Sequence, residues 1–162
     1  MTTLKRCLDY LDAHHVRYAH TVHSAAITAK QVAAAEYMPA HRMAKSVVIC
    51  GEGFVFAVVP ADTHVDLAQL RIAIGVSDLR VAAEAEIFLL FPNSELGAMP
   101  PLGPLFDMPV YLDGELARQL FITFNAGTHR DVIHMKTSDF TRLVQPVIGD
   151  FSRARIAESV SA

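Results

Sequence analysis

Residues 44–62 read AKSVVICGEGFVFAVVPAD, and this stretch decides the fold. It contains two apolar runs, Ala44 to Cys50 and Phe54 to Val59, joined by Gly51-Glu52-Gly53. Glycines between two apolar runs of strand length are a strong signal for a hairpin turn. Pro60-Ala61-Asp62 then closes the second run. The stretch therefore predicts two antiparallel strands of one sheet.

Apolar spacing on both sides of the hairpin predicts helices interspersed with further short strands. The N-terminal segment, for example, places Leu4, Cys7, Leu8 and Leu11 on one face at helical spacing. Helices are expected at residues 4–14, 28–36, 66–74, 84–90 and 138–144, and strands at 17–22, 79–81, 110–112, 120–124 and 131–136. This order predicts the α/β (α+β) class, with a mixed sheet wrapped by helices. We expect one domain over residues 1–162, with a frayed tail from about residue 152.

The composition is that of a globular protein with no general affinity for nucleic acid. Apolar residues make up 52% of the 162 residues and charged residues 19%, and the net charge is −3. That charge argues against broad contact with a phosphate backbone and against DNA as a partner, but it allows a local contact with one end of an RNA. The sequence has no signal peptide and no stretch of transmembrane length, so we expect no membrane partner and a cytoplasmic location. Cys7 and Cys50 lie among apolar residues, and we expect both to be buried free thiols.

Residues 97–103, Gly-Ala-Met-Pro-Pro-Leu-Gly, suit neither a helix nor a strand. The two prolines remove two N–H donors and fix φ, while the flanking glycines permit angles that other residues avoid. The segment predicts a stiff, sharply turned loop. This loop is either a structural turn or a cradle whose remaining N–H groups hold an oxyanion or a carbonyl. It is not a P-loop, because no Gly-Lys-Ser/Thr sequence follows.

Two further positions suggest a site. Lys45 is one of only four lysines and stands at the start of the first hairpin strand. It is either a solvated lysine at a strand end or a cation at a pocket rim, placed to meet a phosphate, a carboxylate or a polarised carbonyl. The run Asn125-Ala126-Gly127-Thr128-His129 follows an apolar strand. Because it lies in a turn at a strand end, His129 is better placed for function than His14 or His15.

The histidines raise the alternative of a metal-dependent hydrolase, which would use His20, His23, His129 or His134. The chain has neither a His-Glu-x-x-His nor a Cys-x-x-Cys sequence, the usual zinc-binding patterns. It also lacks the Gly-x-Ser-x-Gly sequence of a serine hydrolase. We therefore expect no metal and no other cofactor, and no residue stands out as a protein nucleophile or as a general base.

Several of these residues together resemble the YbaK-like family of aminoacyl-tRNA editing domains, which are related to the insertion domain of bacterial prolyl-tRNA synthetase. The resemblance rests chiefly on Lys45, on Gly97-x-x-x-Pro101-Leu-Gly103 and on Phe124-Asn125-Ala126-Gly127-Thr128-His129. Further matches are Val59-Pro60-Ala61-Asp62, Val65-Asp66-Leu67, Phe91-Pro92 and Asp113, so that it covers residues 21–146. It implies a mixed, largely antiparallel sheet with flanking helices. It also implies a free-standing, metal-independent deacylase that hydrolyses the ester of a mischarged tRNA.

The resemblance assigns roles to individual residues. Lys45 would fix the ester carbonyl or the terminal nucleotide, and the N–H groups of Gly97 and Ala98 would hold the carbonyl end of the aminoacyl group. Pro101 would stiffen that loop. The substrate-binding residues implied or favoured by position are Thr28, Val47, Met99, Pro100, Pro101, Gly127 and His129, with His134 as a second choice of histidine.

The implied reaction is direct attack of water on the ester, oriented by Lys45 and the loop and helped by the terminal ribose hydroxyl. A synthetase pocket separates substrates that differ by one methylene by only about 1–3 kcal/mol, so a second, hydrolytic sieve is required. The small pocket favours a small amino acid, with alanine on a proline tRNA as the leading expectation. Candidates for contact with the tRNA acceptor end are Lys30, Arg42, Arg71 and Arg130.

Two other functions stay open at this point. One is a non-catalytic module that binds a tRNA end or a nucleotide. The other is an interaction domain attached to an aminoacyl-tRNA synthetase, which would be its partner.

Overall fold

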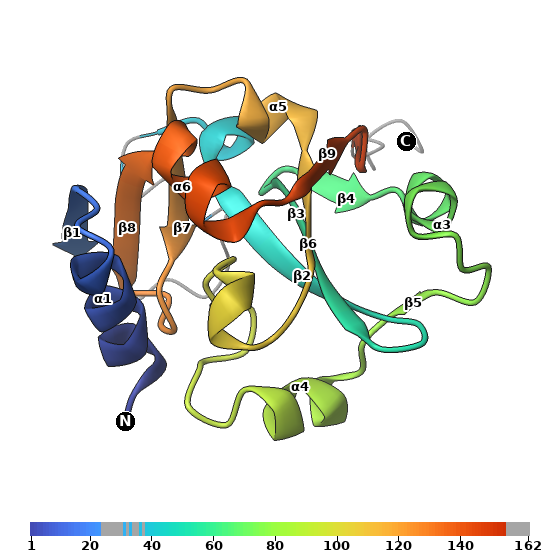
Figure 1. The fold of residues 1–162 in the computed structure, drawn as a ribbon, viewed down its shortest axis with the longest axis horizontal. Helices are drawn as coiled ribbons and strands as arrows, with labels where there is room; N and C mark the ends of the chain where they lie inside the picture. The colour runs from blue at the N-terminus through green and yellow to red at the C-terminus, as the bar shows by residue number, and fades with distance from the viewer. Residues whose placement is uncertain (24–30, 32, 34–35, 37, 155–162) are drawn as a thin grey trace, which may run out of the picture.

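The computed structural model describes residues 1–23, 31, 33, 36 and 38–154. A mixed five-stranded sheet crosses the middle of the fold (Figure 1), with the strand order β5-β2-β3-β6-β9. Its strands are β2 (Ala44–Cys50), β3 (Phe54–Pro60), β5 (Arg80–Val81), β6 (Val110–Asp113) and β9 (Val147–Gly149). β2 pairs antiparallel with β3 and with β5, whereas the pairs β3–β6 and β6–β9 are parallel.

The predicted hairpin is confirmed, with a register that runs from Ala44 opposite Pro60 to Cys50 opposite Phe54. Alternate side chains of β3 enter two different cores. Phe56 and Val58 belong to the main core, while Ala57 and Val59 belong to a second core on the other face of the sheet. A strand that is buried on both faces needs apolar residues at every position, which explains the unbroken apolar run.

A second sheet has the order β1-β8-β7 and is antiparallel throughout. It consists of β1 (Tyr18–Val22), β7 (Phe121–Asn125) and β8 (Asp131–Lys136). A single parallel bridge between Met43 and Thr123 joins the residue before β2 to the middle of β7. The two sheets therefore meet where β2 begins, which is the position of Lys45.

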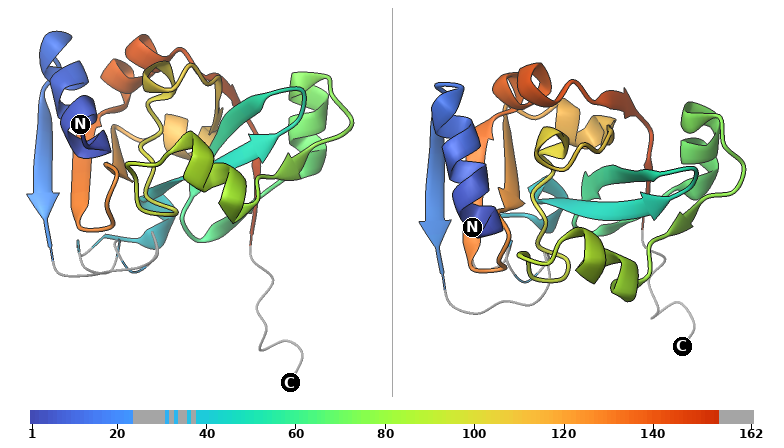
Figure 2. Two further views of the ribbon diagram at one scale, coloured as in Figure 1. Left: turned by 90° about the horizontal axis from the view of Figure 1, so that it is seen from below. Right: turned by 60° about the horizontal axis from the view of Figure 1, so that its bottom comes forward.

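The helices cover these sheets. α1 (Thr3–Ala13) lies beside β1 and β8 in both views of Figure 2. The Thr2 side chain caps α1 by accepting the N–H of Lys5 at 3.1 Å. α1 contributes Cys7 and Leu11 to the main core, and α6 (Thr137–Val144) contributes Phe140. The remaining helical segments are α3 (Leu67–Ile74), α4 (Glu84–Leu90), α5 (Gly114–Ala117), and the 3-10 turns η1 (Ala40–Arg42) and η2 (Gly103–Leu105).

The predicted limits of the helix after the hairpin are confirmed by its caps. The Asp66 side chain accepts the N–H of Gln69 at 3.2 Å, and α3 begins at the next residue. Gly75 ends the helix with φ +79°, a conformation that glycine adopts without strain. The expected mixed, largely antiparallel architecture with flanking helices is confirmed.

The C-terminal segment differs from the expectation. The frayed tail predicted from about residue 152 is wrong for residues 152–154, which form β10 (Ser152–Ala154) antiparallel to β4 (Thr63–Val65). The reason is an anchor just before β10, where Phe151 is buried and its N–H donates to the Asp113 carboxylate at 2.8 Å. β4 and β9 were also not predicted.

Three other expectations were a helix at 28–36, two buried free thiols and the absence of a stretch of transmembrane length. The predicted helix at 28–36, with Thr28 and Lys30, falls largely outside the described residues. Cys7 is a buried free thiol as expected, but the free thiol of Cys50, next to the hairpin turn, is only half-buried. Within the described ranges, no helix is long and apolar enough to cross a bilayer.

Candidate active site

Lys45 is half-buried on β2, opposite Val59 of β3. Its ammonium group donates a hydrogen bond to the backbone carbonyl of Thr63 at 2.5 Å. The Thr63 hydroxyl in turn donates to the carbonyl of Pro60 at 2.7 Å, which fixes the corner between β3 and β4. This contact orients the ammonium group, which has three donor hydrogens.

The strand that carries Lys45 runs beside the strand that leads into the second predicted motif. Met43 bridges Thr123 in a parallel sense, and Lys45 and Asn125 each lie two residues further along. β2 and β7 therefore advance together, and Asn125 ends β7 immediately before the turn at Ala126 and Gly127. Asn125 is buried, and its side-chain NH₂ group has no hydrogen-bond partner in the described part of the chain.

The predicted rigid loop and the turn after β7 form one hydrogen-bonded unit. The N–H of Glu95 donates to the carbonyl of Gly127 at 2.8 Å, and the N–H of Gly127 donates to the carbonyl of Ala98 at 2.8 Å. Gly97 and Gly127 both have positive φ, +81° and +95°. These conformations explain the two glycines, because a side chain would be strained at either position.

The loop also determines which N–H groups remain for a ligand. The N–H of Ala98 is already donated to the carbonyl of Glu95 at 3.0 Å, so that it closes the turn. In the described residues, the N–H groups of Gly97 and Met99 donate to no protein acceptor. Pro100 and Pro101 have no N–H, and both are buried, as is Met99. Of the predicted cradle donors, Gly97 thus retains its N–H for a ligand, whereas the N–H of Ala98 is used within the loop.

His129 lies against this loop. Its backbone N–H donates to Glu95 Oε1 at 2.8 Å, and its ring Nδ1 lies 3.3 Å from the same oxygen. Only 7% of His129 is exposed. A Cβ placed on Gly97 would lie 3.5 Å from His129 Nε2, so the other ring nitrogen faces the glycine. The structure therefore brings Gly97, Gly127 and His129 together.

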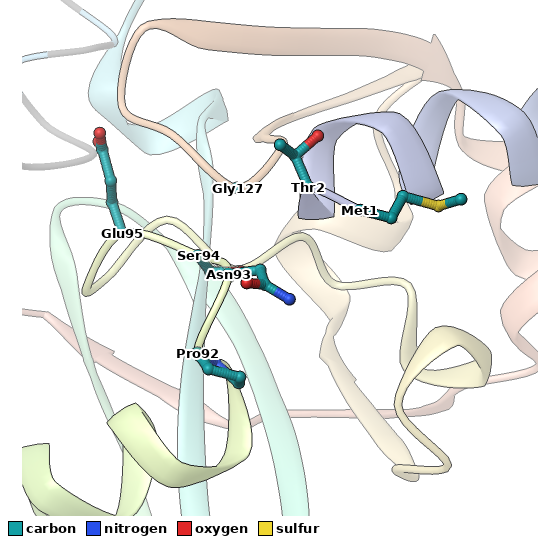
Figure 3. A pocket seen from close by; sticks show the side chains of 7 residues that line it. All are labelled: Met1, Thr2, Pro92, Asn93, Ser94, Glu95 and Gly127. Atoms are coloured by element: carbon teal, nitrogen blue, oxygen red, sulfur yellow. The ribbon is translucent and has the colours of Figure 1, made fainter.

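A cleft of about 510 Å³ opens beside the unit formed by the loop and the turn. Figure 3 shows the start of α1 on one side of Gly127 and the segment 92–95 on the other. The two sides are joined by the Ser94 hydroxyl, which donates to Thr3 Oγ1 at 2.7 Å. The residues that line the cleft are Met1, Thr2, Pro92, Asn93, Ser94, Glu95 and Gly127.

Two residues of this site were not predicted. Glu95 belongs to no recognised motif, and its contact with His129 joins residues 34 apart in the sequence. Asn125 was quoted only as part of a motif, because the sequence did not indicate that its amide would be buried without a partner. The second-choice histidine, His134, lies elsewhere on β8, with Thr123 at Nδ1 (3.0 Å) and Glu36 at Nε2 (3.2 Å).

The residues of the metal-hydrolase alternative are held apart by different carboxylates. His20 pairs with Asp131 at 2.7 Å, His129 with Glu95 and His134 with Glu36. In the part of the chain that is described, no three His, Cys, Asp or Glu side chains come together in a way that could hold a metal ion. Burial raises the pKa of the Cys7 thiol to about 12, so this thiol stays protonated near neutral pH and is a poor nucleophile.

Comparison with known proteins adds to this geometry. The model of the aminoacyl-tRNA editing domain family matches residues 23–143. The multifunctional Ser/Thr-tRNA deacylase ProXp-y of Escherichia coli strain K12 is 33% identical over 100 residues, which are 61% of this chain and 59% of that protein. The same deacylase of Escherichia coli O157:H7 matches equally. The match thus spans about three-fifths of the length of these relatives.

Solved structures show the same fold. The crystal structure described as a putative trans-editing enzyme for prolyl-tRNA synthetase has a TM-score of 0.81 at 23% identity, over 95% of this chain and 99% of that one. A crystal structure of a hypothetical protein has a TM-score of 0.82 at 16% identity, over 91% and 99% of the two chains. The matched family model covers most of the chain, including Lys45, the Gly97 loop and the turn at His129, and the chain therefore belongs to the aminoacyl-tRNA editing domain family.

Proposed function

We propose that this protein is a free-standing editing deacylase, which hydrolyses the ester bond between a mischarged amino acid and the 3′ end of a tRNA. The observation that carries the proposal is the joined loop and turn, in which the N–H group of Gly97 has no described protein acceptor and the imidazole of His129 faces Gly97. A backbone N–H group without a protein acceptor is suited to an oxyanion, which develops on the carbonyl oxygen when an ester is attacked.

Lys45 supplies the positive charge in the proposed reaction. Its ammonium group, oriented by the Thr63 carbonyl, binds the ester carbonyl or a phosphate of the terminal nucleotide. Water then attacks the carbonyl carbon, and the ribose oxygen leaves. Placing water and ester in one fixed geometry lowers the barrier, because no further ordering is needed at the moment of reaction.

The substrate is a tRNA that carries a small amino acid. The sequence favoured alanine on a proline tRNA, whereas the name of the Escherichia coli relatives points to serine and threonine. The net charge of −3 suits a short contact with the acceptor end over an extended RNA surface. Arg130, exposed next to His129, and Arg42, exposed shortly before β2, are the proposed RNA contacts. A cytoplasmic location and association with a synthetase follow as expectations of this proposal.

The test is a deacylation assay with tRNAs that carry alanine, serine, threonine or cysteine, with and without a chelator. Wild type should hydrolyse one or two of these esters, and Lys45→Ala should lower the rate at least about 100-fold. Lys136→Ala, at an exposed lysine on β8, is the matched control and should retain the wild-type rate.

Three results would contradict the proposal. Full activity of a folded Lys45→Ala protein would remove the role of Lys45. Binding of the tRNAs without hydrolysis of any ester would favour the non-catalytic binding module. Loss of activity with the chelator would favour the metal-dependent alternative.

A further inference from the structure

The pair formed by Glu95 and His129 has a geometry that the other histidine–carboxylate pairs lack. Glu95 Oε1 receives both the backbone N–H of His129, at 2.8 Å, and its ring Nδ1, at 3.3 Å. One oxygen thus fixes both the position of the residue and the rotation of its ring. The imidazole is 7% exposed, whereas about half of the Glu95 side chain remains exposed.

This contact determines which ring nitrogen carries the proton. An ionised carboxylate only accepts hydrogen bonds, so Nδ1 must be the donor. In the neutral ring, Nε2 then has a lone pair and accepts. A carboxylate that holds Nδ1–H is a well-established way to orient a histidine that works through Nε2.

Nε2 points to the loop that presents the two N–H groups. The position of a Cβ on Gly97 would be 3.5 Å from Nε2 and 3.9 Å from Cε1. Because Gly97 has no side chain, no side-chain atom of this residue lies between the loop backbone and Nε2. The acceptor nitrogen of His129 and the N–H group of Gly97 therefore lie at the same part of the loop.

Two of the other histidine pairs differ in this respect. His41 uses Nδ1 for Asp62 at 3.1 Å and Nε2 for Glu115 at 3.5 Å. His134 also has a partner at each ring nitrogen. Compared with these two, His129 is distinct because Nε2 has no hydrogen-bond partner in the described residues, although the residue is more than nine-tenths buried.

We propose that His129 is the general base of the deacylation and that Glu95 is the residue that positions it; this inference rests on the proposed function. Nε2 takes a proton from water while the water oxygen forms a bond to the ester carbonyl carbon. The electron pair of the carbonyl moves to its oxygen, which the loop N–H groups stabilise. The intermediate then collapses, the bond to the ribose oxygen breaks, and the proton passes from Nε2 to that oxygen. The products are the free amino acid and a tRNA with a terminal hydroxyl.

Single-turnover hydrolysis by full-length variants tests the role of both residues. His129→Gln should lower the rate about 100-fold and Glu95→Gln about tenfold, since a positioned base contributes on the order of 10²–10⁴. Glu95→Asp should restore part of the loss. The matched control is Glu115→Gln, which removes a carboxylate from the exposed His41 and should stay within about twofold of wild type. Circular dichroism and tRNA affinity should be unchanged in Glu95→Gln.

A spectroscopic measurement tests the orientation independently of activity. Long-range ¹H–¹⁵N correlation spectra of wild type, assigned with His129→Gln, should show His129 with its proton on Nδ1. Glu95→Gln should weaken that preference, while Glu115→Gln should leave it unchanged. A wild-type His129 with its proton on Nε2 would overturn the inference.

The assays separate the two proposals. If wild type hydrolyses an ester and both His129→Gln and Glu95→Gln keep the wild-type rate, the general base is wrong while the deacylase stands. If wild type hydrolyses none of the esters, the deacylase fails and the base role fails with it. The proton position then still decides whether Glu95 orients His129.

Discussion

The candidate site combines two regions that are built in opposite ways. Lys45 lies on a regular strand, where the ladder with β3 fixes the backbone and the side chain supplies the chemistry. In the Gly97 loop the backbone supplies the N–H group, and Gly97 has no side chain. The difference teaches where each region is sensitive. The strand should tolerate changes that keep the cation in place, and the loop should tolerate almost no added atoms.

The largest effect is expected when the cation is kept but its shape is changed. Lys45→Arg preserves the charge, but a planar guanidinium cannot take the place of a compact ammonium 2.5 Å from the Thr63 carbonyl. We expect deacylation to fall about 100-fold with little change in the unfolding midpoint. Activity close to wild type would mean that the strand contributes only charge.

The second effect concerns the backbone of the turn. A Cβ on Gly127 would lie 2.8 Å from the Cβ of Thr3, and φ is +95°. Gly127→Ala should therefore lower the free energy of unfolding by about 2–3 kcal/mol, from backbone strain and from displacement of the start of α1. Gly53→Ala, where a Cβ would meet nothing within 4 Å, should change it by less than about 1 kcal/mol. Urea unfolding compares the two, and equal stabilities would show that α1 moves without cost.

The same contrast explains which features the sequence could predict. The hairpin, α1 and α3 depend on local signals such as apolar period, Asp66 and Gly75, and their limits were predicted closely. β4, β9 and β10 are three residues long each and exist through their partners, so no local period indicates them. Pairing with residues that are distant in the sequence therefore determines these strands.

The site follows the same rule. Gly97, Gly127 and His129 stand in motifs that signal unusual backbone, and the structure brings them together. Glu95 contacts His129, which is 34 residues away in the sequence. The N–H of Ala98 donates to a carbonyl within the loop. Both contacts depend on the folded backbone and have no local signal in the sequence. A site residue could therefore be predicted from the sequence where the local backbone conformation requires that residue type. It could not be predicted where a contact with a distant residue is what matters.

A smaller effect distinguishes backbone strain in the loop from the filling of the space beside His129. Gly97 and Gly75 have nearly equal φ, +81° and +79°, so alanine should cost each about 1 kcal/mol of stability. Only at Gly97 would the methyl group lie 3.5 Å from His129 Nε2, whereas at Gly75 it meets nothing within 4 Å. Gly97→Ala should reduce deacylation about tenfold and Gly75→Ala should not, because the added methyl group occupies the space beside His129 Nε2 where the substrate must lie. An equal loss in both variants would mean that stability alone is measured.

The smallest expected effect is a pH-dependent change in stability at His41, close to the strand that carries Lys45. His41 precedes β2, and its hydrogen bond to Asp62, helped by Glu115, raises the pKa of His41 despite partial desolvation. A raised pKa stabilises the fold below the ordinary histidine pKa of about 6.5, and this stabilisation is lost as the pH rises through the higher value in the folded state. His41→Gln should therefore lower the unfolding midpoint at pH 6 by on the order of 1 °C, since the pair is exposed, and by less at pH 8.5. His64→Gln, at another exposed histidine, is the control for the replacement of a surface histidine. A larger loss at pH 8.5 than at pH 6 would reverse the sign and exclude the pair as a stabilising contact at the Lys45 end of the sheet.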